Sequence, residues 1–90
     1  MNKGVTTMAN RHLLALSDID HFKQWLQAEG WTIEQTKGYY ETLRARHPKQ
    51  KLPLIFYKKL DAKMHCSIDE RYLWLLSRYF NYKRRVKNGE

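Results

Sequence analysis

Aromatic and basic side chains lie close together along one stretch of the chain, and this combination suits contact with nucleic acid. Residues 39–46 have the period of a β-strand, and one face of that strand would carry Tyr40, Thr42, Arg44 and Arg46. Lys and Arg neutralise phosphates, while an exposed aromatic ring can stack on an unpaired base. The predicted face is therefore a candidate nucleic-acid-binding surface, although Tyr, Thr and Arg also suit an ordinary solvated strand face.

Further cations extend this candidate surface beyond the strand. Residues 37–90 hold fourteen Lys and Arg against five Asp and Glu, whereas residues 1–36 hold three against four. A field of one sign on an aromatic-rich surface attracts polyanions, so DNA or RNA is the expected partner, with the choice between them open. The additional phosphate contacts that we predict are Lys49, Lys51, Lys58, Lys59, Arg78, Lys83, Arg84 and Arg85.

A second group of residues points to a different kind of partner. Arg71, Trp74 and Arg78 are spaced by three and four residues, so they would share one stripe of a helix. Trp and Arg are favoured at the centres of protein interfaces. An inhibitor or adaptor that targets an acidic surface of a host protein is therefore the alternative hypothesis. Trp74 could instead pack under the segment at Leu13 and Leu14.

Patterns for catalysis or metal binding are weak. The four His residues are scattered, and none has the spacing of a zinc motif. His65 and Cys66 are adjacent and would point to opposite faces of a strand. Asp69 and Glu70 fit the first turn of a helix better than a catalytic pair. We therefore expect a protein that is not an enzyme and has no cofactor and no metal.

Length and composition favour one small domain in a reducing compartment. The 90 residues contain a single cysteine, Cys66, which cannot form an internal disulfide. No apolar run approaches the ~20 residues that span a bilayer. We expect a cytoplasmic protein without a membrane segment. Its folded domain would cover residues 13–84, between a flexible N-terminus at 1–12 and a basic flexible tail at 85–90.

Two helices are predicted near the ends of that domain. Apolar residues spaced by three and four predict a helix over residues 18–29. Ser17 or Asp18 would cap this helix, and Gly30 would end it. A similar pattern predicts a second helix over residues 67–84, where Ser67 and Glu70 have the spacing of a capping box.

A β-hairpin is predicted between the two helices. Its strands are residues 39–46 and 52–59, joined by a turn at Pro48. Tyr39, Leu43 and Ala45 would face the core. Glu41 would share that face at the sheet margin, beside a Lys or Arg.

A weaker signal at residues 61–66 allows a third strand. The fold class is therefore α+β, in the order α-β-β-α or α-β-β-β-α, with two helices packed on one face of a small antiparallel sheet. A hairpin leaves free edges, so a homodimer could form by pairing of the strands at residues 52–57.

Two short runs resemble a known family. Residues 25–31, Trp-Leu-Gln-Ala-Glu-Gly-Trp, and residues 36–40, Thr-Lys-Gly-Tyr-Tyr, resemble the HicA/YcfA-like toxins. In that family a helix ending in Gly-Trp precedes a strand and then a Lys-Gly-Ser-His motif. The resemblance implies a fold similar to the double-stranded-RNA-binding domain. Lys37 and Gly38 match the motif, but Tyr39 and Tyr40 stand where Ser and the ribonuclease His would be, so the activity is not implied.

Residues 37–48 are also similar to a block found in small uncharacterised phage and prophage proteins. This likeness implies an origin in a mobile element and carries no assigned activity. The sequence therefore leads to the hypothesis of a non-enzymatic nucleic-acid-binding protein that serves as a phage or prophage accessory or regulatory factor.

Overall fold

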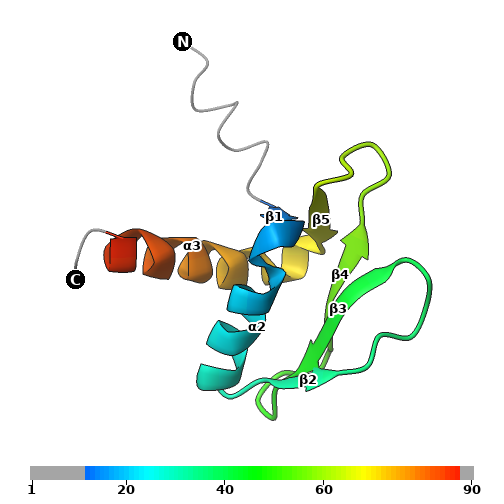
Figure 1. Cartoon of the computed structure of the whole chain (residues 1–90). Helices are drawn as coiled ribbons and strands as arrows, with labels where there is room; N and C mark the ends of the chain where they lie inside the picture. Colours follow the sequence, from blue (N-terminus) through cyan, green and yellow to red (C-terminus); the bar gives the residue numbers. More distant parts are fainter. Residues whose placement is uncertain (1–11, 88–90) are drawn as a thin grey trace.

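A five-stranded antiparallel sheet and two helices make up the fold (Figure 1). The computed structural model describes residues 12–87. The strands lie in the spatial order β1-β5-β4-β3-β2. Their bounds are β1 Leu13–Ala15, β2 Thr32–Glu34, β3 Glu41–Arg46, β4 Leu54–Lys58 and β5 His65–Ile68, and the helices are α2 Ile19–Ala28 and α3 Leu73–Lys87. The predicted α+β class and antiparallel sheet are confirmed.

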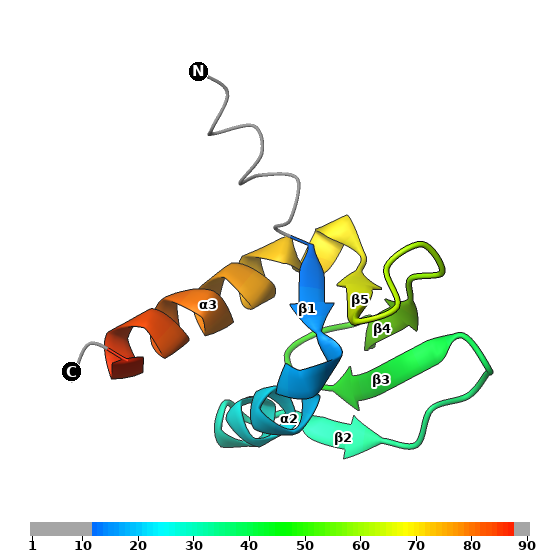
Figure 2. The same cartoon turned by 45° about the horizontal axis from the view of Figure 1, so that its top comes forward.

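Both helices cover the same face of the sheet. The strands bury alternate residues on that face, including Leu14, Leu43 and Phe56, as expected for strands with one covered side. These residues form one core with Phe22 of α2 and Tyr79 of α3, both fully buried. The C-terminal half of α3 extends beyond the sheet, away from the loop between β4 and β5 (Figure 2). No helix of residues 12–87 covers the other face of the sheet, which is called the open face below.

The first helix starts and ends close to the predicted positions. A 3-10 turn at Leu16–Asp18 precedes α2, and Asp18 occupies the cap position without a side-chain capping bond. Its carboxylate instead accepts a hydrogen bond from Lys83 Nζ at 2.6 Å, which ties the start of α2 to α3. Gly30 has a positive φ of 96° and follows the C-cap residue Glu29, so its predicted role as a stop is confirmed.

The second helix begins later than predicted, and Ser67 is not its cap. Ser67 lies inside β5, where it is paired with Leu13 of β1 and with Tyr57 of β4. The cap is Asp69, whose Oδ1 accepts a hydrogen bond from the backbone N–H of Arg71 at 3.1 Å. A 3-10 turn at Glu70–Tyr72 then leads into α3. Pairing on both sides holds Ser67 in the sheet, so the 3-10 turn begins at Glu70 and α3 only at Leu73.

The sheet has more strands than the predicted hairpin, and the predicted strands have other bounds. The three-residue strands β1 and β2 were not predicted, and the third strand lies at His65–Ile68 rather than at 61–66. Strand β3 begins only at Glu41, so Tyr39 lies in a loop and is 74% exposed instead of facing the core. A register shift between Glu41 and Leu43 makes Thr42 an extra residue in β3, which is a β-bulge.

The predicted dimer edge is not available in this sheet. Strand β4 lies between β3 and β5, and β3 lies between β4 and β2, so both strands of the hairpin are already paired on both sides. Among the strands of residues 12–87, β1 and β2 lie at the edges of the sheet.

The chain ends also differ from the predicted boundaries. Residues 85–87, predicted as part of a flexible tail, are the last residues of α3. His12, predicted to be flexible, accepts a hydrogen bond at its carbonyl from Ile68 N–H at 3.1 Å. The remainder of both predicted flexible segments, residues 1–11 and 88–90, lies outside the described residues. No helix within residues 12–87 is long and apolar enough to cross a membrane.

Replacing Gly30 by Ala should destabilise the fold. An L-residue at positive φ costs about 1–2 kcal/mol, and a Cβ at this position would lie 3.0 Å from His47 Nε2. We expect Gly30→Ala to lower the free energy of unfolding by about that amount in urea titrations. Gly38→Ala is the matched control, because nothing lies within 4 Å of its Cβ position. An equal loss in both variants would contradict the assigned role of Gly30.

Candidate nucleic-acid interface

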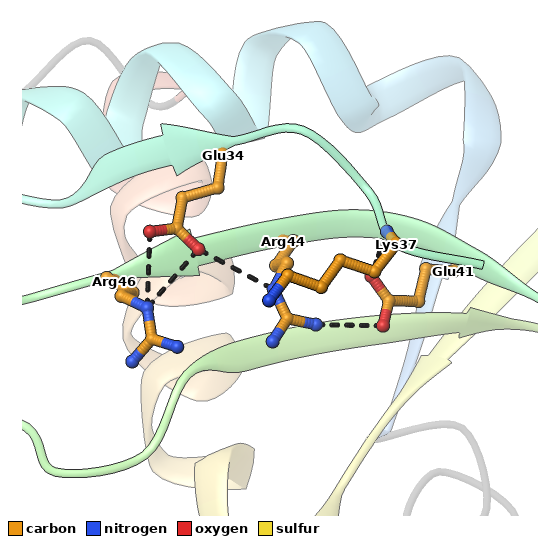
Figure 3. Close-up of polar contacts among 5 residues, drawn as sticks. All are labelled: Glu34, Lys37, Glu41, Arg44 and Arg46. Carbon is orange, nitrogen blue, oxygen red and sulfur yellow. Dashed lines mark hydrogen bonds and ion pairs between the residues drawn. The ribbon is translucent and has the colours of Figure 1, made fainter.

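Arg44, a predicted phosphate contact, is a buried cation that holds two carboxylates on the open face (Figure 3). Its Nη1 donates to Glu41 Oε2 at 2.8 Å, and its Nε lies 3.5 Å from Glu34 Oε1, an ion pair without a hydrogen bond. Its side chain is only 9% exposed. Arg46 Nε lies 3.2 Å from Glu34 Oε2 on the same face. The two Arg residues therefore serve first to hold β2 against β3.

Glu41 occupies the open face because of the bulge. The extra residue shifts the alternation of β3, so Glu41 reaches Arg44 instead of facing the core. The backbone N–H of Lys37 donates to Glu41 Oε1 at 2.8 Å, and this bond, with the Arg44 guanidinium, holds the pKa of Glu41 below its usual value. The predicted pairing of Glu41 with a nearby cation is confirmed, whereas its predicted place on the core face is wrong.

The predicted cations of α3 are divided between paired and unpaired ones. Arg78 Nη2 lies 2.7 Å from Glu29 Oε1 at the end of α2, and Lys83 is held by Asp18. Arg84 Nη2 donates to Asn81 Oδ1 at 2.9 Å within the helix. Arg85 has no carboxylate of residues 12–87 within 4 Å.

The predicted cations of the hairpin lie at its two opposite ends. Lys49 and Lys51 are exposed in the turn that precedes β4. Lys58 and Lys59 lie at the other end of that strand, and Lys59 Nζ is 3.0 Å from Asp61 Oδ1. Strand β4 therefore separates the two pairs, and the basic end of α3 extends from the sheet as a third group (Figure 2).

Two exposed Tyr residues lie beside the lysines at the end of β4. Tyr39 is 74% and Tyr40 56% exposed, and their rings meet edge to face with centroids 5.1 Å apart. Lys58 Nζ lies 3.6 Å from the centre of the Tyr39 ring, a cation–π contact. The backbone N–H of Lys58 donates to the Tyr40 carbonyl at 2.8 Å, which fixes this loop to β4. We call the residues Tyr39, Tyr40, Lys58, Lys59 and Lys63 the tyrosine–lysine end.

A pocket of about 390 Å³ adjoins the tyrosine–lysine end. Three of its lining residues, Lys58, Lys59 and Lys63, belong to that end, and the others are Leu16, Thr42, Leu60 and His65. Neither Tyr39 nor Lys63 was predicted as a site residue, because Lys58 contacts the Tyr39 ring and shares a pocket with Lys63 only in the folded chain. The available signal was the pair of adjacent Tyr residues before a strand.

Two of the three residues predicted for protein contact, Arg71 and Arg78, form ion pairs within the chain. Arg71 Nη2 lies 2.8 Å from Asp69 Oδ2, and Arg78 is held by Glu29 as described above. Trp74 is 45% exposed, so it is not buried beneath the segment at Leu13 and Leu14. An exposed Trp between two Arg residues is therefore present on the helix surface.

Cys66 lies in the core, outside these surfaces. Its Sγ donates to the Leu14 carbonyl at 3.6 Å, and burial raises the pKa of the thiol to about 12. The thiol is thus protonated near neutral pH. Within residues 12–87 no three His, Cys, Asp or Glu residues lie close enough together to hold a metal ion.

Comparison of the chain with protein-family models, with curated proteins and with solved structures finds no match. The site is therefore interpreted from its own geometry.

The ion pairs on the open face give a prediction for acid pH. Glu41 has a lowered pKa in the folded state, so its contribution to stability is complete above its unfolded pKa of about 4.3. That contribution is lost as the pH falls through the lower folded value. We expect Glu41→Gln to destabilise the protein at pH 7, with the difference from wild type narrowing near pH 3, in urea titrations at both pH values.

The matched control for this prediction is Glu70→Gln. Glu70 is exposed, and no cation of residues 12–87 forms an ion pair with it. Its effect at pH 7 should be smaller than that of Glu41→Gln. A Glu41→Gln effect that is the same at pH 7 and pH 3 would contradict the assigned ion pair.

Proposed function

We propose that the protein is a non-enzymatic nucleic-acid-binding module whose contact surface is the tyrosine–lysine end. The observation that carries this proposal is the exposed pair Tyr39 and Tyr40, fixed next to Lys58. Aromatic rings of this kind offer faces on which bases stack, and adjacent ammonium groups neutralise the phosphates between those bases.

The balance of paired and unpaired charge supports a polyanionic partner. Residues 12–87 contain fifteen Lys and Arg against eight Asp and Glu. Six of these carboxylates form ion pairs with six of the cations, mostly between different elements of the fold. The remaining nine cations have no such partner within residues 12–87, and Lys58 and Lys63 of the tyrosine–lysine end are among them. An excess of this kind attracts nucleic acid.

Single-stranded segments suit this surface better than duplexes. The rings of a duplex are stacked on one another, whereas an unpaired base can stack on an exposed Tyr and contribute ~1–3 kcal/mol per base. The choice between DNA and RNA depends on the 2′-hydroxyl. Binding in the cytoplasm, as a phage or prophage accessory or regulatory factor, is the setting that we propose from the likeness of residues 37–48.

Binding to labelled oligonucleotides tests the proposal. We expect single-stranded DNA or RNA to bind more tightly than duplexes, measured by fluorescence anisotropy. Affinity should fall about tenfold or more between roughly 50 and 200 mM salt if three phosphates are neutralised. Tyr39→Ala and Tyr40→Ala should each weaken binding at least fivefold, because each removes a stacking contact of ~1 kcal/mol or more.

Trp74→Ala is the matched control, since it removes another exposed aromatic ring that lies on α3 and not in the tyrosine–lysine end. It should leave nucleic-acid affinity unchanged. Absence of binding to single- and double-stranded DNA and RNA at low salt would contradict the proposal. Equal losses of affinity in the Tyr and Trp variants would also contradict it.

Protein binding remains the second candidate function, and the exposed Trp74 between Arg71 and Arg78 favours it. Such a partner should carry an acidic surface and survive nuclease treatment during capture. Its binding should be lost in Trp74→Ala and kept in Tyr39→Ala. The opposite pattern would reject the adaptor hypothesis.

A further inference from the structure

The pocket beside the tyrosine–lysine end has apolar walls and a cationic rim. Leu16 and Leu60 are 39% and 73% exposed, so apolar surface is available there for a ligand to cover. Its volume of about 390 Å³ lies within the range of small-molecule sites. The lining residues include three Lys and one His and no carboxylate.

Thr42 contributes a polar group to this pocket that the fold leaves unused. As the extra residue of the bulge it lines the pocket, and its Oγ1 is buried without a hydrogen-bond partner among the described residues. Buried hydroxyls are normally paired, so this one is an exception that calls for an explanation. A hydroxyl can both donate and accept a hydrogen bond, and Thr42 lines the pocket, so a ligand held there is a candidate partner for it.

The three lysines around the pocket differ in the contacts that their ammonium groups make. Lys59 is held by Asp61, whereas Lys63 has no ion pair within residues 12–87, and Lys58 contacts only the Tyr39 ring as a cation. Lys58 thus belongs both to the pocket and to the exposed Tyr pair. A strand that stacks on Tyr39 would pass directly over the rim of the pocket.

We infer that the pocket receives one unstacked base of a bound single strand, with the adjoining phosphate on Lys58 and Lys63. This inference rests on the proposed function and names the ligand of the same site. The base would lie between Leu16 and Leu60, and the Thr42 hydroxyl would bond to one of its polar edges. An acyl chain with a carboxylate would also suit lysines and leucines. It would make no use of the neighbouring Tyr39 and Tyr40 rings.

Base preference is the property that tests this inference. The probes are four single-stranded decanucleotides, each of one base type, and a copy of the tightest binder in which one central base is removed. We expect wild-type protein to distinguish the four probes and to bind the abasic copy more weakly. Thr42→Val keeps the branched shape and removes the hydroxyl. It should lower the ratio between the tightest and weakest probes by at least threefold, because the tightest probe loses its hydrogen bond to the hydroxyl.

Lys63→Ala is the companion variant. It should lower the affinity for all four probes by a similar factor, because it removes a phosphate contact. Urea titration of Thr42→Val provides the folding control, and we expect no loss of stability because the hydroxyl has no partner to lose.

Two results separate the failure of the pocket from the failure of the proposed function. If the probes bind in a Tyr39-dependent manner but Thr42→Val leaves their ratio unchanged, the pocket inference is overturned and the proposed function stands. If no probe binds, both are overturned. Saturable binding of decanoate that Thr42→Val does not weaken, together with no discrimination among the four probes, would also overturn the inference.

Discussion

The β-bulge at Thr42 sets the geometry on both sides of the sheet. An extra residue in β3 shifts the alternation of the strand, so Glu41 reaches the open face while Leu43 and Ala45 stay in the core. Glu41 then accepts hydrogen bonds from Arg44 and from the backbone of Lys37. These contacts fix the start of β3 and the loop before it, and that loop presents Tyr39 and Tyr40. The same bulge places Thr42 in the wall of the pocket.

Opposite charges in this chain join elements that are distant in sequence. Glu34 links β2 to β3 through Arg44 and Arg46, and Glu29 and Asp18 link α2 to α3 through Arg78 and Lys83. Exposed pairs of this kind contribute little to stability one by one, whereas the Arg44 pairs are largely shielded from water. With most carboxylates used in this way, the unpaired positive charge of residues 12–87 lies, apart from Lys23 of α2, at the ends of the sheet and along the last turns of α3. This distribution is the physical basis of the proposed affinity for polyanions.

Sequence periodicity predicted the parts of the fold that depend on local pattern. The apolar spacing gave α2 to within a residue or two, and Gly30 marked its end because a positive φ favours glycine there. The alternation around Leu43 and Ala45 identified the buried face of β3. The bulge could not be predicted, because it depends on how β3 pairs with β4. An unbroken two-residue alternation was assumed instead, and it placed Glu41 on the core face. The predicted core position of Glu41 was wrong for that reason, whereas Tyr39 is exposed because β3 begins only at Glu41.

Other features depend on partners that are far away in sequence. Ser67 and Glu70 have the spacing of a capping box, yet Ser67 is held in β5 by β1 on one side and β4 on the other. The strands β1 and β2 have three residues each, too few to show a period, and they exist because longer strands lie beside them. The candidate cations were predicted one by one. The cations that form ion pairs are those that the fold brings close to a carboxylate, such as Glu34, Glu41, Glu29 or Asp18.

The most direct test of the central claim is an NMR titration of the labelled protein with a short single-stranded oligonucleotide. The proposed contact at the tyrosine–lysine end predicts that the largest amide shifts fall in residues 39–42 and 58–63, with small shifts along α3. Largest shifts around Arg71, Trp74 and Arg78, or no shifts at low salt, would contradict it.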